Sequence, residues 1–109
     1  MRSFATLSGA FLLLTFVLGQ SYKPLSGYVP DATTAAQIAE AVLIPVYGKK
    51  QIESEKPFTA KLEKNIWTVS GTLRCPNGKG GVTTQCDGGT AVVKISKIDA
   101  RILNMMHGK

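Results

Sequence analysis

One stretch, Pro30–Gly48 (PDATTAAQIAEAVLIPVYG), constrains the fold of this chain more than any other. Asp31 can cap a first helical turn through its carboxylate, and Gly48 can take the left-handed conformation that ends a last turn. Because Pro45 lacks an N–H, we expect the helix to stop or kink near Ile44. The apolar residues recur at steps of three and four, which predicts one inner stripe made of Ala35, Ile38, Ala39, Val42 and Val46. One helix cannot bury its own apolar face, so the rest of the chain must cover it.

From Phe58 onward the apolar period changes to two, which is typical of half-buried strands. Phe58, Ala60 and Leu62 alternate with polar residues, and Lys64–Asn65 suits a two-residue turn. The charged segment before them, Lys49–Lys56, is expected to form a short second helix or a turn. The sequence therefore predicts an α+β fold, with one N-terminal amphipathic helix packed on a curved four-stranded antiparallel sheet. The further strands are expected at Ile66–Leu73, Thr90–Lys97 and Ile102–His107.

The first 19 residues have the layout of a secretory signal peptide. Arg2 precedes an apolar run from Ala10 to Leu18, and cleavage is expected near Gly19/Gln20. A single membrane anchor is the alternative, although the apolar run is shorter than the roughly 20 residues that span a bilayer. This interpretation leaves residues 20–29 as an N-terminal arm and residues 30–109 as the domain. It predicts an exported, periplasmic protein with no membrane contact after cleavage.

The chain has two cysteines, Cys75 and Cys86, and an even pair in an exported chain predicts a disulfide. The bridge would close a loop of about 12 residues and stabilise the fold by about 3 kcal/mol in the chain-entropy model. A metal site is the competing interpretation. Two thiols and the distant His107 do not have the spacing of a zinc site, so we expect neither a metal nor a cofactor.

The chain offers little for catalysis. His107 is the only histidine, and we expect it at the surface near the end of the last strand. Glu53 and Glu55 are close in sequence but lie in a lysine-rich segment, which favours a surface role over an acid–base pair. Trp67 is expected in the core because its neighbours alternate. The interpretation is therefore a protein that is not an enzyme, with a small hydrolase as the competing class.

The net charge of +6 would favour an acidic partner. The lysines are scattered rather than clustered in a block, so a nucleic-acid partner is not expected, and they could equally serve solubility alone. The longest irregular stretch is Arg74–Gly89, called the cysteine loop below, and such loops are usually functional or disordered. We expect the binding surface to be this loop together with the exposed face of the sheet. A bridge at its base would reduce the entropy lost on docking. The residues expected to contact a partner are Arg74, Lys79, Gln85 and Asp87.

Three segments together resemble a known family: Val29–Lys50, Lys56–Leu73 and Gly88–Lys109. The features that carry the resemblance are the helix ending in IPVYG, the W-x-V-x-G-T-L strand, the Gly-Gly before the third strand, and the closing ISK-x-D-x-RIL with a terminal H-G-K. They resemble the small bacterial immunity proteins with a nuclear-transport-factor-2-like fold, the YbbC/YhhH family. The resemblance implies a protein that binds and blocks a cognate toxin of a polymorphic-toxin system. It carries no catalytic residue.

The cysteine loop departs from the familiar pattern, in which the connection after G-T-L is short and lacks cysteine. With export, the resemblance implies a toxin that acts in the periplasm, such as a cell-wall hydrolase. The alternative is a periplasmic peptidase inhibitor or sensor module of the PepSY or cystatin-like kind, which the stretch AVVKISKIDARIL also resembles. Exposed strand edges would also allow a homodimer.

Overall fold

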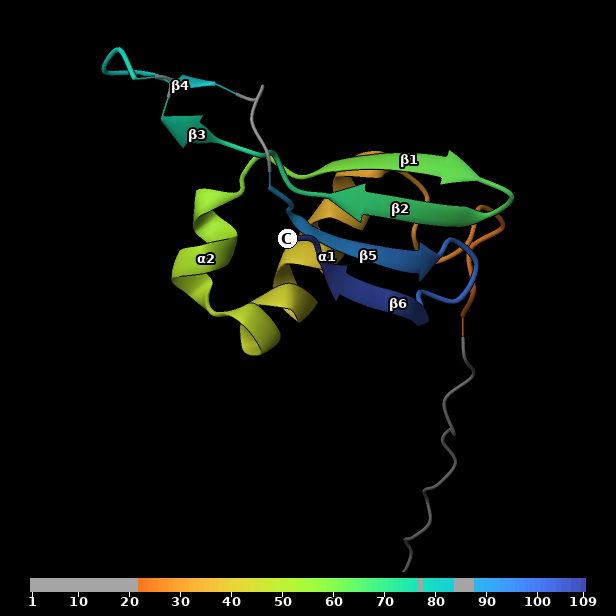
Figure 1. Cartoon of the computed structure of the whole chain (residues 1–109). Coiled ribbons are helices and arrows are strands. Elements are labelled where there is room, and N and C mark those ends of the chain that lie inside the picture. Colours follow the sequence, from red (N-terminus) through yellow and green to blue (C-terminus); the bar gives the residue numbers. More distant parts are fainter. Residues whose placement is uncertain (1–21, 77, 84–87) are drawn as a thin grey trace, which may run out of the picture.

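The computed structural model describes residues 22–76, 78–83 and 88–109, and within them the chain forms two helices followed by strands (Figure 1). The predicted signal peptide and its cleavage point lie outside the described residues. Strands β1, β2, β5 and β6 form one sheet in that order, and β3 pairs with β4 in a separate ribbon. The elements are α1 (Ala32–Tyr47), α2 (Lys49–Ser54), β1 (Thr59–Glu63), β2 (Ile66–Ser70), β3 (Cys75–Pro76), β4 (Val82–Thr83), β5 (Ala91–Ser96) and β6 (Ile102–His107).

The main sheet is an antiparallel meander, as the sequence predicts. Val69 at its centre lies opposite Ala60 on one side and Val93 on the other. The turn between β1 and β2 uses Lys64 and Asn65 at φ values of 51° and 63°, the left-handed conformation that a tight two-residue hairpin requires. The α+β fold, with a helix on a four-stranded antiparallel sheet, is therefore confirmed.

Helix α1 begins as predicted but ends later. The Thr34 N–H donates to the Asp31 carboxylate at 2.8 Å, which is the expected cap. The helix then continues through Pro45 to Tyr47, so of the two outcomes predicted near Ile44 the stop is wrong, whereas the kink stays a prediction. Ala41, whose carbonyl loses its helical partner at Pro45, is exposed, and water can satisfy that carbonyl.

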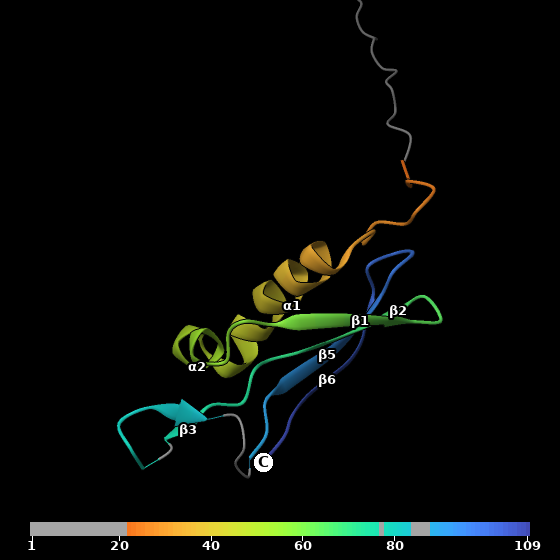
Figure 2. The same ribbon diagram turned by 90° about the horizontal axis from the view of Figure 1, so that it is seen from above.

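The buried side of α1 is a row of residues four apart: Ala35, Ala39 and Leu43 are fully buried against the sheet. Leu43 was not in the predicted stripe, and Val46, which was, is 58% exposed. Val46 lies in the last turn, which extends past the strands toward α2 (Figures 1 and 2). The prediction failed there because spacing defines the side of a helix but not where the covering sheet ends.

The arm before α1 is fixed to the domain by its last residues. The N–H groups of Tyr28 and Val29 donate to the carbonyls of Ile98 and Lys97 at 3.1 Å and 3.0 Å, and Val29 is fully buried. Trp67 is in the core, as predicted, and its indole N–H donates to the Val29 carbonyl at 2.8 Å.

Helix α1 covers one face of the sheet and leaves the other uncovered, as the view from above shows (Figure 2). Residues on the covered face of β5 are fully buried, whereas those on the other face are exposed or half-buried. We call the uncovered side the open sheet face. By strand alternation it comprises Thr59, Lys61, Glu63, Ile66, Thr68, Ser70, Val92, Lys94, Ser96, Asn104 and Met106.

Candidate functional site

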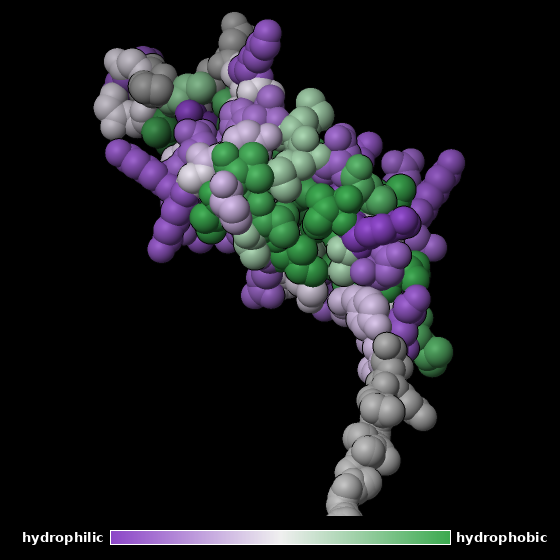
Figure 3. Space-filling view, turned by 90° about the horizontal axis from the view of Figure 1, so that it is seen from below, coloured by the Kyte–Doolittle hydropathy of each residue, from purple (hydrophilic) through white to green (hydrophobic). Residues whose placement is uncertain are grey.

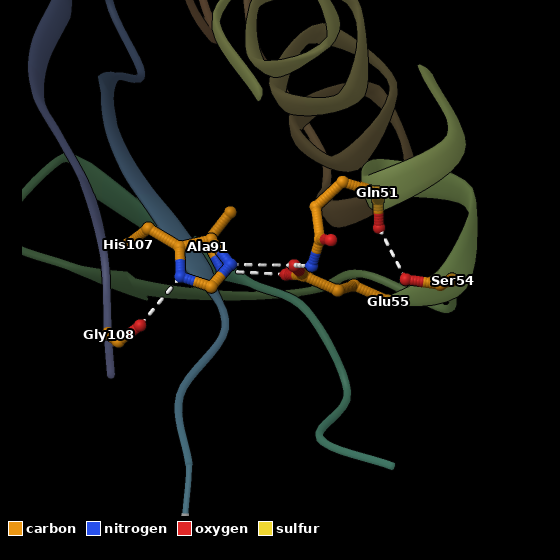
Figure 4. Close-up of polar contacts among 6 residues, drawn as sticks. All are labelled: Gln51, Ser54, Glu55, Ala91, His107 and Gly108. Carbon is orange, nitrogen blue, oxygen red and sulfur yellow. Dashed lines mark hydrogen bonds and ion pairs between the residues drawn. The ribbon is translucent and has the colours of Figure 1, made fainter. Parts of the chain in front are cut away.

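A buried carboxylate joins three segments that are distant in sequence. Glu55, just after α2, is 5% exposed. One of its oxygens accepts the Ala91 N–H at 2.7 Å. The other accepts the Gln51 amide at 2.6 Å and lies 2.7 Å from His107 Nε2 (Figure 4). With Gly108, which contacts the other side of the His107 ring, these residues form what we call the Glu55 cluster.

The backbone around Glu55 is equally constrained. The Thr72 N–H donates to the Glu55 carbonyl at 2.7 Å, and the Thr72 hydroxyl donates to the Pro57 carbonyl at the same distance. Gly71 lies directly against Glu55, because a Cβ added there would be 2.9 Å from the Glu55 Cβ and 2.9 Å from Oε1. Gly71 and Thr72 belong to the G-T-L motif that follows β2, and His107 and Gly108 to the terminal H-G-K, so two motifs that are distant in sequence converge at Glu55.

The hydrogen bonds of His107 define its charge. Nε2 faces the Glu55 carboxylate, and Nδ1 lies 2.6 Å from the Gly108 carbonyl oxygen. Both partners are acceptors, so both ring nitrogens carry a proton in this arrangement, which is the imidazolium form. The hydrogen bond to Glu55 and that to Gly108 raise the pKa of His107 above its ordinary value.

The pKa of Glu55 shifts the opposite way. Burial alone would raise it, but hydrogen bonds from Ala91, Gln51 and His107 together lower it below the ordinary glutamate value. The cluster is thus an ion pair in a low-exposure site. The Tyr47 ring covers the imidazole at a centroid distance of 5.3 Å.

Two predictions about these residues are wrong. Glu55 is buried rather than part of a surface segment, and the His107 side chain is only 25% exposed and ion-paired. Strand alternation could have indicated the second, because His107 lies opposite Ala91 on the covered face. Both ring nitrogens and the carboxylate already have partners, so the arrangement is suited to holding segments together rather than to transferring a proton to a substrate.

The predicted partner-binding residues lie on a different feature. The cysteine loop contains the short β3–β4 ribbon, which projects from the α2 end of the molecule in both ribbon views (Figures 1 and 2). Arg74 and Lys79 are exposed on it. Gln85 and Asp87 lie outside the described residues. So does Cys86, and therefore its disulfide with Cys75 in β3 stays a prediction.

The open sheet face carries a row of polar side chains that crosses all four strands. Lys61, Thr68, Lys94 and Asn104 lie directly opposite one another on β1, β2, β5 and β6. Beside this row is a shallow hollow of about 280 Å³. Its lining residues are Glu63, Lys64, Ile66, Thr68 and Lys94.

Apolar side chains gather on the side of the molecule where β6 forms the sheet edge (Figure 3). Ile102, Leu103 and Met106 of β6 are 40%, 42% and 51% exposed. The β6 strand shifts register opposite Lys94 and Ile95, which interrupts the edge and disfavours continuous pairing with another strand. The homodimer stays a prediction.

The described part of the chain was searched for metal-ligand groups and for helices that could span a membrane. Within residues 22–76, 78–83 and 88–109, no group of three or more His, Cys, Asp or Glu side chains could hold a metal ion. Neither helix in these ranges is long and apolar enough to cross a bilayer.

Comparison with known proteins gives a consistent result. Residues 34–109 match the family described as NTF2 fold immunity protein. Two similar proteins of Escherichia coli strain K12 are the uncharacterized proteins YhhH, 33% identical, and YbbC, 28% identical, each over 74% of this chain. The match covers 58% and 60% of those relatives, so the chain spans about three fifths of their length. No solved structure matches it.

Proposed function

We propose, from the premise that this chain belongs to the NTF2 fold immunity protein family, that it binds a cognate toxin and neutralises it. The observation that carries the proposal is the extent of the match. It begins in the first turn of α1 and runs to the C-terminal residue, so it includes the whole sheet and the Glu55 cluster. An immunity protein needs a stable surface and no catalytic centre.

The chemistry of the Glu55 cluster supports the same function. Its carboxylate and imidazole satisfy each other and their backbone neighbours, which leaves no free general base there. The cluster holds α2 against the ends of β5 and β6, and so it fixes the shape of the sheet that a partner would meet.

The proposal also includes the cellular compartment in which the toxin is neutralised. The basic Arg2 and the apolar run from Ala10 to Leu18 support export, and an exported inhibitor would meet its toxin in the periplasm. A toxin with that site of action is, in this proposal, a cell-wall hydrolase.

The experiment is a protection assay in which the product of each adjacent gene is tested as the candidate toxin. The toxin is expressed in a bacterial host in two forms, one exported to the periplasm and one retained in the cytoplasm. Each form is expressed with and without the full chain. We expect growth to be rescued in the periplasmic arm, and the purified mature chain to form a one-to-one complex. Rescue in the cytoplasmic arm alone would contradict the compartment, and no rescue or complex in either arm would contradict neutralisation.

A further inference from the structure

We infer that the toxin docks on the open sheet face, around Lys61, Thr68 and Lys94, and that the toxin surface it meets is acidic. The inference rests on the proposed function and gives it a location and a partner chemistry. It narrows the expected interface, which comprised the cysteine loop and the exposed sheet face, to the sheet face alone.

The first argument is geometric. Lys61 and Lys94 lie on either side of Thr68 in one cross-strand row. Neighbouring strands are about 4.8 Å apart, so the two lysine backbones are about 10 Å apart on a shared surface. The row is held by three strands of the main sheet, so docking there requires ordering of side chains but not of a loop.

The second argument is charge. Lys61 and Lys94 are both exposed, and neither forms an ion pair with any of the described residues. Lys64 adds a third cation at the rim of the hollow, against one carboxylate, that of Glu63. Carboxylates on a partner would relieve the repulsion among these lysines and would steer the encounter.

The third argument is composition. Half-buried Ile66 and Val92 and exposed Met106 lie around the polar row. Protein–protein interfaces combine apolar side chains with polar and charged ones, and the open sheet face offers both kinds.

The same features argue against a second copy of this chain as the occupant. A two-fold contact through this face would bring the lysines of one copy against those of the other, and like charges placed opposite each other are unfavourable. A partner with acidic side chains has no such penalty.

The test uses the purified toxin that the protection assay identifies and measures its affinity for the mature chain by calorimetry. We expect the double variant Lys61→Glu/Lys94→Glu to lose about a hundredfold in affinity, because both attractive contacts become repulsive. Its thermal midpoint should be unchanged, since both side chains are exposed. Reversing the facing carboxylates of the toxin to lysine should restore binding.

Two control variants separate the outcomes. Lys49→Glu/Lys50→Glu makes the same change of charge on α2. We expect it to lower the affinity for the toxin by less than about threefold, because it changes only the overall electrostatic field of the protein. Arg74→Glu/Lys79→Glu reports on the cysteine loop. If that variant loses binding while Lys61→Glu/Lys94→Glu keeps it, the inference is wrong and the immunity function stands. If the unmodified chain neither binds nor protects, the proposed function fails and the inference falls with it.

Discussion

The Glu55 cluster and the cysteine loop lie near the same end of the molecule and are built in opposite ways. The cluster is buried and joins residues up to 52 positions apart, Glu55 and His107, through direct hydrogen bonds. The ribbon in the loop has only two residues in each strand, with exposed Arg74 and Lys79 beside it. The cluster therefore depends on the packing of the whole domain, whereas the loop depends mainly on its predicted covalent bridge.

This contrast shows where to look for stability and where for recognition. Changes at Glu55 should loosen α2, β5 and β6 together, because all three contribute to its hydrogen bonds. Changes in the cysteine loop that spare its two cysteines should stay local.

The largest effect is expected from Glu55→Ala. The change leaves the His107 imidazolium and the Ala91 N–H without their acceptor, and breaking a buried pair in this way costs about 3–5 kcal/mol. Chemical denaturation of the unmodified chain and of Glu55→Ala at pH 6 measures the difference in their unfolding free energies. The matched control is Glu53→Ala, which removes an exposed ion pair with Lys56 and should cost less than about 1 kcal/mol. Equal losses in the two variants would mean that the cluster is not a stabilising site.

The next effect tests the loop. If Cys75 and Cys86 are bridged, Cys75→Ser should lower the unfolding free energy by about 3 kcal/mol and weaken partner binding. Thermal unfolding in the presence and absence of a reducing agent measures the first, and calorimetry with the toxin domain measures the second. An unchanged melting temperature with intact binding under reducing conditions would show that the bridge is absent or irrelevant.

A smaller effect is expected from Gly71→Ala. The added methyl group would lie 2.9 Å from the Glu55 Cβ, which forces the carboxylate or β2 to move and costs about 1–3 kcal/mol. Gly78→Ala is the comparison in the loop. Its Cβ would meet nothing within 4 Å, so only the left-handed backbone at φ +79° opposes it, by about 1 kcal/mol. A greater loss of unfolding free energy in Gly78→Ala than in Gly71→Ala would contradict the prediction that the Glu55 cluster contributes more to stability than the cysteine loop.

The smallest effect is a pH dependence that belongs to the cluster alone. The raised pKa of His107 contributes stability that is complete below its ordinary value of 6.5 and is lost as pH rises through the raised value. The lowered pKa of Glu55 contributes stability that is complete above 4.5 and is lost as pH falls through the lowered value. The pair therefore stabilises most between pH 4.5 and pH 6.5.

Denaturation curves at pH 6 and pH 9 measure the alkaline side of this profile. The unfolding free energy should decrease at pH 9 in the unmodified chain. The decrease should be smaller in His107→Asn, which has no titrating ring. The same slope in both proteins would assign the pH dependence to other groups.

Much of the fold could be predicted from the sequence because local patterns determine it. The alternation in β5 reproduces its buried residues Ala91, Val93 and Ile95, and Lys64–Asn65 forms the expected turn. The family resemblance is confirmed by the match over residues 34–109. The exposure of Val46 and the continuation of α1 through Pro45 could not be predicted, since they depend on how far the sheet extends and on whether water reaches a carbonyl.

The Glu55 cluster could not be predicted because its partners are set by tertiary contacts. Nothing in the local sequence distinguishes Glu55 from Glu53, yet one is buried and the other exposed. The difference arises because Glu55 follows the last turn of α2 and faces Gly71, just after β2, and Ala91, at the start of β5.

Trp67 gives this protein a built-in optical probe. It is the only tryptophan in the chain, it is 6% exposed, and its indole N–H is bonded to the Val29 carbonyl. Release of the arm from the sheet would free that N–H and expose the ring to water, which shifts indole emission to longer wavelength. Unlabelled protein can thus report by fluorescence whether a substitution unfolds the whole domain or only detaches the arm at Val29.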